Sequence, residues 1–501
     1  MKHFSATKLY ALAFGLFLGL CLWKFGNPVI LDHQIPPPAT PAELLNDPWP
    51  LRWANWILPP LAALGALLVF QNYKMGSAPA PGAVFRALAK NPDAQDNSKP
   101  TKVSARTSLA ARRDQQRPRA GALPQRLWLL PLAWLGWQFF SATQTVDATL
   151  TAATLWQFSG VVACYFLGAL VFARENLTRW LLIGLLAAFA FCLVRSVNQK
   201  LFEYPQSRQE LAEGERSGWT NFPPEAVAQM KIENIIITTN GADVANPVIM
   251  AKFVKGRVSG TLVYPNALAG IILLLWPVSL ALAFGATKNL KPFIRFAAIA
   301  LVIFLGGAAF FWSGSKLGWL IGMGVAGLFL LRLDWPKKLK LATVAAVLIF
   351  GLGIFAVRFH GYFAAGATSA GARFDYWRAA AQTAAANPVF GSGPGTFQRP
   401  YAQLKAPASE MARLAHNDYL EQFSDSGLGG GLAYAAWIFL ALAAAGKNLR
   451  RGGDAFFFAI FAGLLGWFAQ GFGEFALYIP GLAWPAFTLL GVLAARPVPR
   501  T

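Results

Sequence analysis

Twelve apolar runs, most of them close to 20 residues long, dominate the sequence. An α-helix needs about 20 residues to cross the roughly 30 Å of bilayer hydrocarbon. Only 13% of the 501 residues are charged, about half of the roughly 25% usual in soluble domains. The pattern predicts an all-α polytopic membrane protein with about twelve transmembrane helices and excludes a disordered chain. The runs are 8–23, 53–70, 127–142, 151–172, 180–196, 262–285, 296–312, 317–331, 341–357, 419–445, 455–470 and 481–495.

The charges between these runs predict an orientation. Lys and Arg number 44 against 23 acidic residues, a net charge of +21. With a cytoplasmic N-terminus, the short inner segments hold 16 Lys and Arg and the short outer segments hold 3. Positive residues collect on the cytoplasmic side of short loops. We therefore expect a multi-pass membrane protein with both termini cytoplasmic. The basic excess follows from topology, so no nucleic-acid partner is expected.

The runs divide the chain into five expected parts. Two of the intervening loops, 197–261 and 358–418, are long and are expected to be periplasmic. A run Ile235–Thr239 followed by Asn240-Gly241 predicts a strand and a tight turn in the first of them. The parts are an N-terminal two-helix segment (1–73), a disordered basic cytoplasmic linker (74–126), three helices and the first long loop (127–254), a core with the second long loop (255–445), and the C-terminal helices (446–501).

Arg373 and Arg378 open an alanine-rich segment that predicts a helix from Ala372 to Ala386, ended by Asn387-Pro388. An arginine in the first turn opposes the helix dipole. It is well placed if an anion docks there, since free N–H groups and a guanidinium would both point at it. An interfacial helix with Arg and Trp at the headgroup level is the alternative.

His416 precedes the tenth run, at a predicted helix start with Asn417 or Asp418 as its cap. The positive end of a helix disfavours a charged imidazole, so this histidine is expected to be neutral and able to accept a proton. The alternative is a capping-region residue with no chemistry. Upstream, the glycines of Gly391-Ser392-Gly393-Pro394-Gly395 predict a tight turn near a ligand or a neighbouring helix rather than a nucleotide loop.

Two further cations fall on the same expected side of the membrane. Arg257 enters the sixth run, and Lys316 lies in a short outer turn that the positive-inside rule disfavours for lysine. Snorkelling is the ordinary alternative for Lys316. With Arg373, Arg378 and His416, they predict a cationic, carboxylate-poor pocket suited to a polyanionic substrate. The three cysteines lie singly in apolar runs and no Asp-X-Asp pair faces this side, so no metal site or cofactor is expected.

The order of these motifs resembles the O-antigen ligase and O-antigen polymerase (Wzy-type) superfamily over about residues 255–445. The most specific part is His416-Asn417 followed by Gly427-Leu428-Gly429. The other similar pieces are Gly260, Tyr264-Pro265-Asn266, Ser315-Lys316-Leu317-Gly318, Arg373 with Trp377, Asn387-Pro388, and Gly391-Ser392-Gly393 with Phe397.

The resemblance implies a GT-C-like, inverting, metal-independent glycosyltransferase. Such enzymes move a glycan from an undecaprenyl-diphosphate carrier to a lipid A core or polysaccharide acceptor. Carried over by position, Lys316, Arg373, Arg257 and Arg378 would hold the diphosphate and His416 would act on the acceptor hydroxyl. Asn417, Asn266 and Asp425 would support them. Lys316 stands where the family usually has arginine, so it supplies charge without the bidentate fork.

Two other classes of function compete with an enzyme. Twelve spans also occur in secondary transporters, but these place ionisable groups near mid-membrane in repeated halves, and no repeat is visible here. A non-catalytic assembly partner is the other alternative. Within the enzyme class, the sequence does not choose among lipopolysaccharide ligation, polysaccharide polymerisation and protein O-glycosylation.

Overall fold

The computed structural model describes residues 5–76, 128–364, 366–407, 409–450 and 454–495. Almost all of its regular structure is helical, and its two strands form one antiparallel hairpin. The prediction of an all-α polytopic membrane protein is confirmed. The linker predicted at 74–126 lies outside the described residues from residue 77 onward.

Each of the twelve apolar runs forms a helix over most of its described length. Within the described residues, eight helical segments are long and apolar enough to cross a membrane by length and composition. Four other runs form helices of 13 to 16 residues, which is less than the roughly 20 residues of a straight crossing. The long helices are α1 (Ala6–Lys24), α3 (Leu51–Gly76), α7 (Ala148–Leu167) with its continuation η3 (Gly168–Phe172), α8 (Glu175–Asn198), α12 (Pro265–Ala286), α13 (Pro292–Ser313), α15 (Lys337–Ala364) and α18 (Asp418–Arg450). The short ones are α6 (Leu130–Ala142), α14 (Lys316–Leu331), α19 (Ala455–Gln470) and α20 (Pro480–Ala494).

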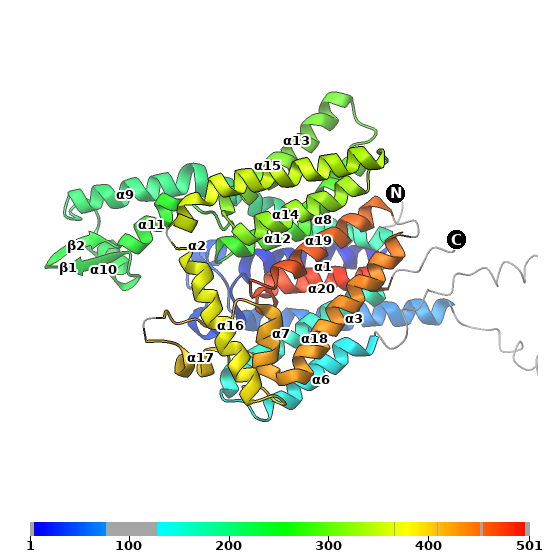
Figure 1. The fold of residues 1–501 in the computed structure, drawn as a ribbon, viewed down its shortest axis with the longest axis horizontal. Helices are drawn as coiled ribbons and strands as arrows, with labels where there is room; N and C mark the ends of the chain where they lie inside the picture. Colours follow the sequence, from blue (N-terminus) through cyan, green and yellow to red (C-terminus); the bar gives the residue numbers. More distant parts are fainter. Residues whose placement is uncertain (1–4, 77–127, 365, 408, 451–453, 496–501) are drawn as a thin grey trace, which may run out of the picture.

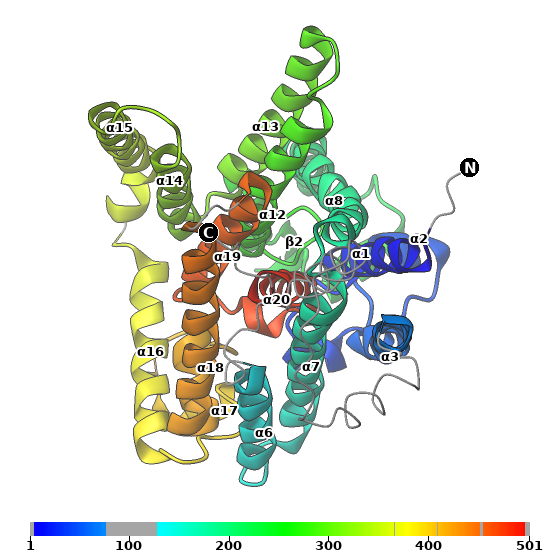
Figure 2. The ribbon, with the colours of Figure 1, turned by 90° about the vertical axis from the view of Figure 1, so that its right-hand side faces the viewer.

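The short helix α20 forms the centre of the bundle, with α1, α7, α18, α19 and α12 around it (Figure 2). Every one of its 15 residues is buried. Glycines let its neighbours approach closely, as is common between membrane helices. A Cβ on Gly491 would lie 2.0 Å from the carbonyl oxygen of Tyr165, and a Cβ on Gly168 the same distance from that of Thr488. A helix enclosed by protein need not match the bilayer thickness by itself.

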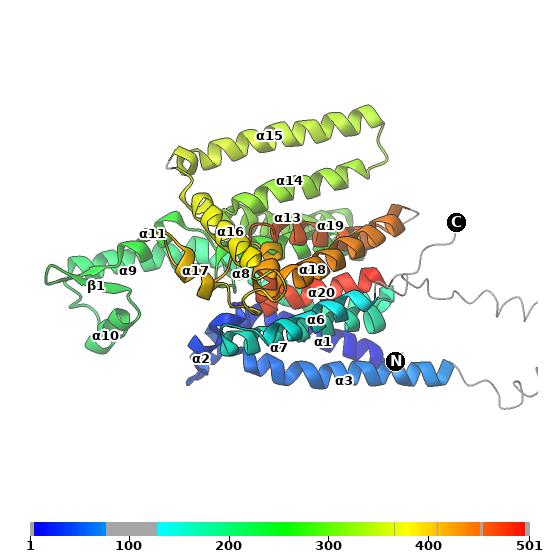
Figure 3. The ribbon, with the colours of Figure 1, turned by 60° about the horizontal axis from the view of Figure 1, so that its bottom comes forward.

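Peripheral helices present the apolar surface. α13 and α15 lie along one side of the bundle and α3 along another (Figures 1 and 3). Large apolar side chains on α15 are exposed, including Phe350 and Val357. Such extensive exposed apolar surface is what a lipid environment accommodates.

Residues 199–255 form a small unit that projects from the bundle (Figure 1). The predicted strand is confirmed, because Asn240-Gly241 joins β1 to β2 as a two-residue hairpin. Both turn residues have positive φ, which this type of hairpin requires. Leu211, Trp219, Ile236 and Ala245 form its core. Its elements are η4 (Gln199–Glu203), α9 (Tyr204–Arg216), α10 (Pro224–Ile232), β1 (Ile236–Thr239), β2 (Ala242–Ala245) and α11 (Pro247–Lys255).

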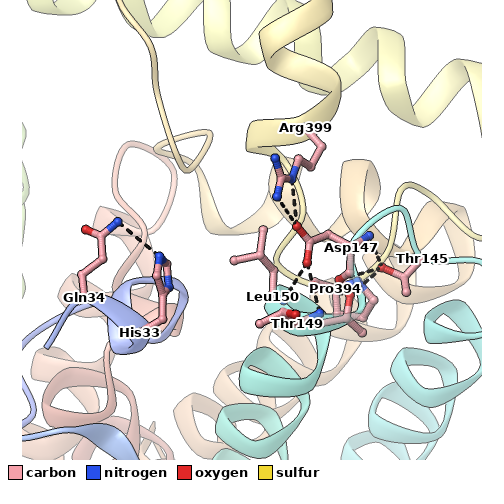
Figure 4. Close-up of polar contacts among 9 residues, drawn as sticks. His33, Gln34, Thr145, Asp147, Thr149, Leu150, Pro394 and Arg399 are labelled. Carbon is pink, nitrogen blue, oxygen red and sulfur yellow. Dashed lines mark hydrogen bonds and ion pairs between the residues drawn. The ribbon is translucent and has the colours of Figure 1, made fainter. Parts of the chain in front are cut away.

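The predicted loop 358–418 is shorter and more helical than expected. α15 continues to Ala364, and two helices follow, α16 (Thr368–Ala386) and α17 (Gln398–Leu404). Two contacts fasten this segment to the N-terminal half of the chain. Arg399 forms an ion pair with Asp147, the N-cap of α7 (Figure 4), and Arg413 donates to Gln34. The remaining short elements are η1 (Val29–Gln34), α2 (Pro41–Asn46) and η5 (Ala476–Tyr478).

Candidate functional site

A cavity of about 380 Å³ opens where α12, α14 and α18 begin and where α16 passes them. Its wall combines charged groups with apolar side chains. The apolar part includes Leu317, Leu320, Phe355 and Phe363. The charged and strongly polar part consists of Arg257, Asn266, Ser315, Lys316, Ser369, Arg373, Glu410, His416 and Glu474.

Arg373 reaches the cavity from the second turn of α16. The helix begins at Thr368, four residues before the predicted start, after Ala367 with a left-handed φ of 51°. The prediction that Arg373 lies in the first turn, beside free helix N–H groups, is therefore wrong. Its Nη2 lies 2.5 Å from Oε1 of Glu474, and 22% of the side chain remains exposed.

Glu474 connects the cationic groups of the cavity to one another through hydrogen bonds. Its Oε1 accepts from Arg373 and also from Nδ2 of Asn266, at 2.8 Å. Asn266 in turn accepts from Nη2 of Arg257, at 2.7 Å. The side chain of Glu474 is only 3% exposed. The sequence predicted a carboxylate-poor pocket, and this is wrong, because Glu474 and Glu410 both line the wall.

The turn between α13 and α14 fixes Arg257. Nε of Arg257 donates to the carbonyl oxygen of Ser313, at 2.8 Å. Gly314 follows with a φ of 58°, and a Cβ there would lie 3.1 Å from the same Nε. A larger residue at this position would be strained and would crowd the guanidinium.

Lys316 follows directly, and Ser315 caps its helix by accepting from the N–H of Gly318. Lys316 precedes the apolar run of α14, at the cavity end of the helix. Its Nζ lies 3.7 Å from the ring centre of Tyr362 and 5.3 Å from that of Phe359. Burial, followed by the charges of Arg257 and Arg373, lowers the pKa of Lys316 to about 8.

His416 has an unusual backbone conformation, with a φ of 52°. Its ring stacks on Tyr376 at 5.8 Å between ring centres and meets the edge of Phe475 at 4.6 Å. Nδ1 lies 3.8 Å from Oε2 of Glu474, which is too long for a hydrogen bond. Asn417 accepts from the N–H of Leu420, which confirms the predicted cap of α18.

A tyrosine and a second carboxylate complete this side of the wall. Tyr376 donates its hydroxyl proton to Oε1 of Glu410, at 2.5 Å. Burial, followed by the neighbouring Glu410, raises the pKa of Tyr376, so its phenol stays protonated and keeps this bond. The stacked ring of Tyr376 thereby holds one face of His416.

Three predicted site residues do not line the cavity, and one of them is Asn417, which only caps α18. Arg378 does not join the cations of the cavity, because it is 64% exposed and pairs with Asp375 three residues before it on α16. Asp425 is buried in α18, where its Oδ2 accepts from the N–H of Gly395 and from the hydroxyl of Tyr478. It supports the glycine-rich turn rather than lining the cavity.

That turn packs against neighbouring helices, which confirms one of the two predicted possibilities. Gly391, Gly393 and Gly395 all have positive φ. A Cβ on Gly391 would lie 2.4 Å from the backbone carbonyl carbon of Asp425 in α18, and a Cβ on Gly395 would lie 2.0 Å from Oγ1 of Thr154 in α7. Among the described residues, no group of three or more His, Cys, Asp or Glu side chains could hold a metal ion.

Comparison with known proteins identifies the segment that carries most of this cavity. Residues 299–435 match the family model of the O-antigen ligase. The chain contains an O-antigen ligase domain. The domain runs from α13 into α18 and holds Lys316, Arg373 and His416. No curated protein matches the chain.

Three cavity residues lie outside the matched segment of the O-antigen ligase domain. Arg257 and Asn266 precede it and Glu474 follows it, and the fold packs all three against its cavity. Sequence reasoning named the first two and missed Glu474. A signal was present, since Glu474 is the only acidic residue after Asp454 in an otherwise apolar stretch. A lone carboxylate in such a stretch is costly to bury and marks a functional position.

Proposed function

We propose that this protein is a glycosyltransferase of the bacterial inner membrane that uses an undecaprenyl-diphosphate-linked glycan as donor. It transfers the glycan to an acceptor hydroxyl on the periplasmic side. The match to the O-antigen ligase family supports a ligase or polymerase type of enzyme.

The observation that carries the proposal is the convergence of three cations and a histidine on one cavity. Arg257, Lys316 and Arg373 come from three separate segments and face the same space as His416. Fixed cations outside bulk water stabilise the negative charge that develops on a diphosphate leaving group. The apolar wall around Phe355 and Phe363 fits the first isoprenoid units of a lipid carrier.

The reaction would be a single displacement. The acceptor oxygen forms a bond to the anomeric carbon while His416 takes the hydroxyl proton. The bond from that carbon to the diphosphate oxygen breaks, and its electron pair leaves on undecaprenyl diphosphate, next to Arg373, Arg257 and Lys316. The configuration at the anomeric carbon is inverted. A positioned histidine base contributes about 10²- to 10⁴-fold to such a step.

A transfer assay with the purified, reconstituted protein tests this function. The donor is a glycan on undecaprenyl diphosphate, offered with lipid A core, with a growing polysaccharide or with a protein acceptor. We expect product with one acceptor class, and loss of product in Arg373→Ala. Arg378→Ala is the matched control, because it removes an exposed arginine from the same helix, outside the cavity. Equal loss in both variants would argue against the cavity as the donor site.

The competing function is solute transport. Transporters place ionisable groups near the middle of the membrane. The cations of this cavity instead cluster at helix ends. Solute flux in proteoliposomes without any glycan product would favour the transporter.

A further inference from the structure

We infer that Glu474 is a positioning residue that holds the proton of His416 on Nδ1 and leaves Nε2 free to accept the proton of the acceptor hydroxyl. The inference rests on the proposed function and adds to it a residue outside the O-antigen ligase domain. The two atoms that face each other, Nδ1 of His416 and Oε2 of Glu474, are both buried and have no hydrogen-bond partner in the described part of the chain. They lie 3.8 Å apart.

Buried polar atoms without partners are costly, and each one asks for an explanation. A ring shift of under 1 Å would turn this contact into a hydrogen bond from Nδ1–H to the carboxylate. Catalytic hydrogen bonds are often long before substrate binds and tighten in the complex. The side chain of His416 is 29% exposed although its Nδ1 is buried, so its accessible surface lies on other atoms of the side chain.

The other hydrogen bonds of Glu474 fix the orientation of its carboxylate. Oε1 is occupied by Nη2 of Arg373 and Nδ2 of Asn266, both of which only donate. Oε2 is therefore the oxygen that remains for the histidine and for the buried hydroxyl of Tyr264, which also lies next to this carboxylate. The carboxylate balances the cations through one oxygen and orients the imidazole through the other.

Several charged and titratable groups surround this pair. The main chain also fastens it, because the N–H of Asp418 donates to the carbonyl oxygen of Glu474, at 3.1 Å. The environment is cationic on the Oε1 side of Glu474 and aromatic around the imidazole of His416. The groups are Arg373 and Tyr376 from α16, Arg257 and Tyr264 from the segment before α12, Lys316 from α14, Asp418 from α18, and Glu410.

Because of this geometry, the substitution Glu474→Gln is a specific test of the inferred role. In Glu474→Gln, the carbonyl oxygen of the amide is held at the Oε1 position, because Arg373 and Asn266 both donate there. The amide NH₂ then faces Nδ1 of His416 and donates to it. The imidazole proton moves to Nε2, and the histidine can no longer accept a proton from the acceptor. Glu474→Asp keeps the charge and the acceptor and is expected to retain the wild-type tautomer.

The first test is ¹⁵N NMR of histidine side chains in the full-length protein in nanodiscs, with the His416 signal assigned by its loss in His416→Asn. We expect the Nδ1–H tautomer in the wild type and in Glu474→Asp, and the Nε2–H tautomer in Glu474→Gln. Glu410→Gln is the control, because it removes a cavity carboxylate that contacts Tyr376 rather than His416. An unchanged tautomer in Glu474→Gln would overturn the inference.

The second test separates turnover from donor binding. Glu474→Gln should lower kcat by about 10²-fold or more, as for loss of a general base. Its affinity for undecaprenyl diphosphate should be equal or higher, since no carboxylate competes for Arg373. Weaker binding of this probe together with lower kcat would show a merely structural role. If the wild type gives no transfer at all, the proposed function fails, whereas the tautomer measurement still decides the role of Glu474.

Discussion

Arg373 and Glu474 form a partly buried ion pair across 101 positions of sequence, with Nη2 of the arginine 2.5 Å from Oε1 of the glutamate. The pair joins α16 to the turn before α20. An arginine buried without a partner would be costly, and the carboxylate of Glu474 balances its charge. Under the proposed function, a diphosphate bound here would compete with Glu474 for the same guanidinium.

Arg373→Lys should weaken transfer roughly 10- to 100-fold, the equivalent of one charge-assisted hydrogen bond of about 1.5–3 kcal/mol. Lysine keeps the charge but cannot serve Glu474 and a phosphate oxygen through one planar fork. The loss should appear as weaker binding of the lipid-linked donor, measured at matched membrane levels of protein. Wild-type donor binding in this variant would contradict the diphosphate role.

His416→Asn should reduce turnover by about 10²- to 10⁴-fold and leave donor binding nearly intact. Asparagine tolerates the left-handed backbone of this position, where φ is 52°, better than alanine does. It thereby removes the base without the backbone strain expected in His416→Ala. His33→Ala is the control, because His33 lies in η1, outside the cavity. Near wild-type transfer in His416→Asn would refute the proposed mechanism.

Transfer should fall at alkaline pH because Lys316 loses its charge. Burial lowers the pKa of Lys316 to about 8, so the cation is present below that pH and is lost as the pH rises through it. The alkaline limb of kcat/KM in the free enzyme should therefore begin near pH 8. In Lys316→Arg the side chain stays charged, and this limb should move to higher pH. An identical profile in both proteins would exclude Lys316 as the titrating group.

Gly391→Ala should destabilise the protein. Gly391 has a φ of +64°, and a Cβ there would lie 2.4 Å from the backbone carbonyl carbon of Asp425. The left-handed backbone alone costs about 1–3 kcal/mol for a residue other than glycine, and the overlap adds to it. Thermal unfolding in detergent measures the effect. Gly371→Ala in α16 is the control, since a Cβ there meets nothing within 4 Å. Equal melting temperatures would contradict the packing described here.

A cysteine placed at Ala406 should react with an impermeant maleimide in intact spheroplasts, and one placed at Lys338 should not. Both positions are exposed, and the native Cys21, Cys164 and Cys192 are buried and should stay silent. The expectation follows from the 16-to-3 charge bias of the short loops. The reverse labelling pattern would place the cavity on the cytoplasmic side and exclude a periplasmic acceptor.

The sequence by itself determined the helices. Each apolar run is helical, because a long apolar segment in a bilayer must satisfy its backbone hydrogen bonds internally. Local chemistry also determined the Asn240-Gly241 hairpin and the Asn417 cap, since each depends on residues within a few positions of one another. The start of α16 was misplaced because no residue near Ala372 marks it.

Only the tertiary structure decided which charges meet. Arg373 and Arg378 look alike in sequence, yet the first faces the cavity and the second faces out, because five residues turn an α-helix by well over one full turn. Glu474 joined the site although it lies far along the chain from Arg373, Asn266 and His416. The long-range packing that brings α12, α16, α18 and the turn before α20 together depends on close backbone approach, which no local pattern encodes.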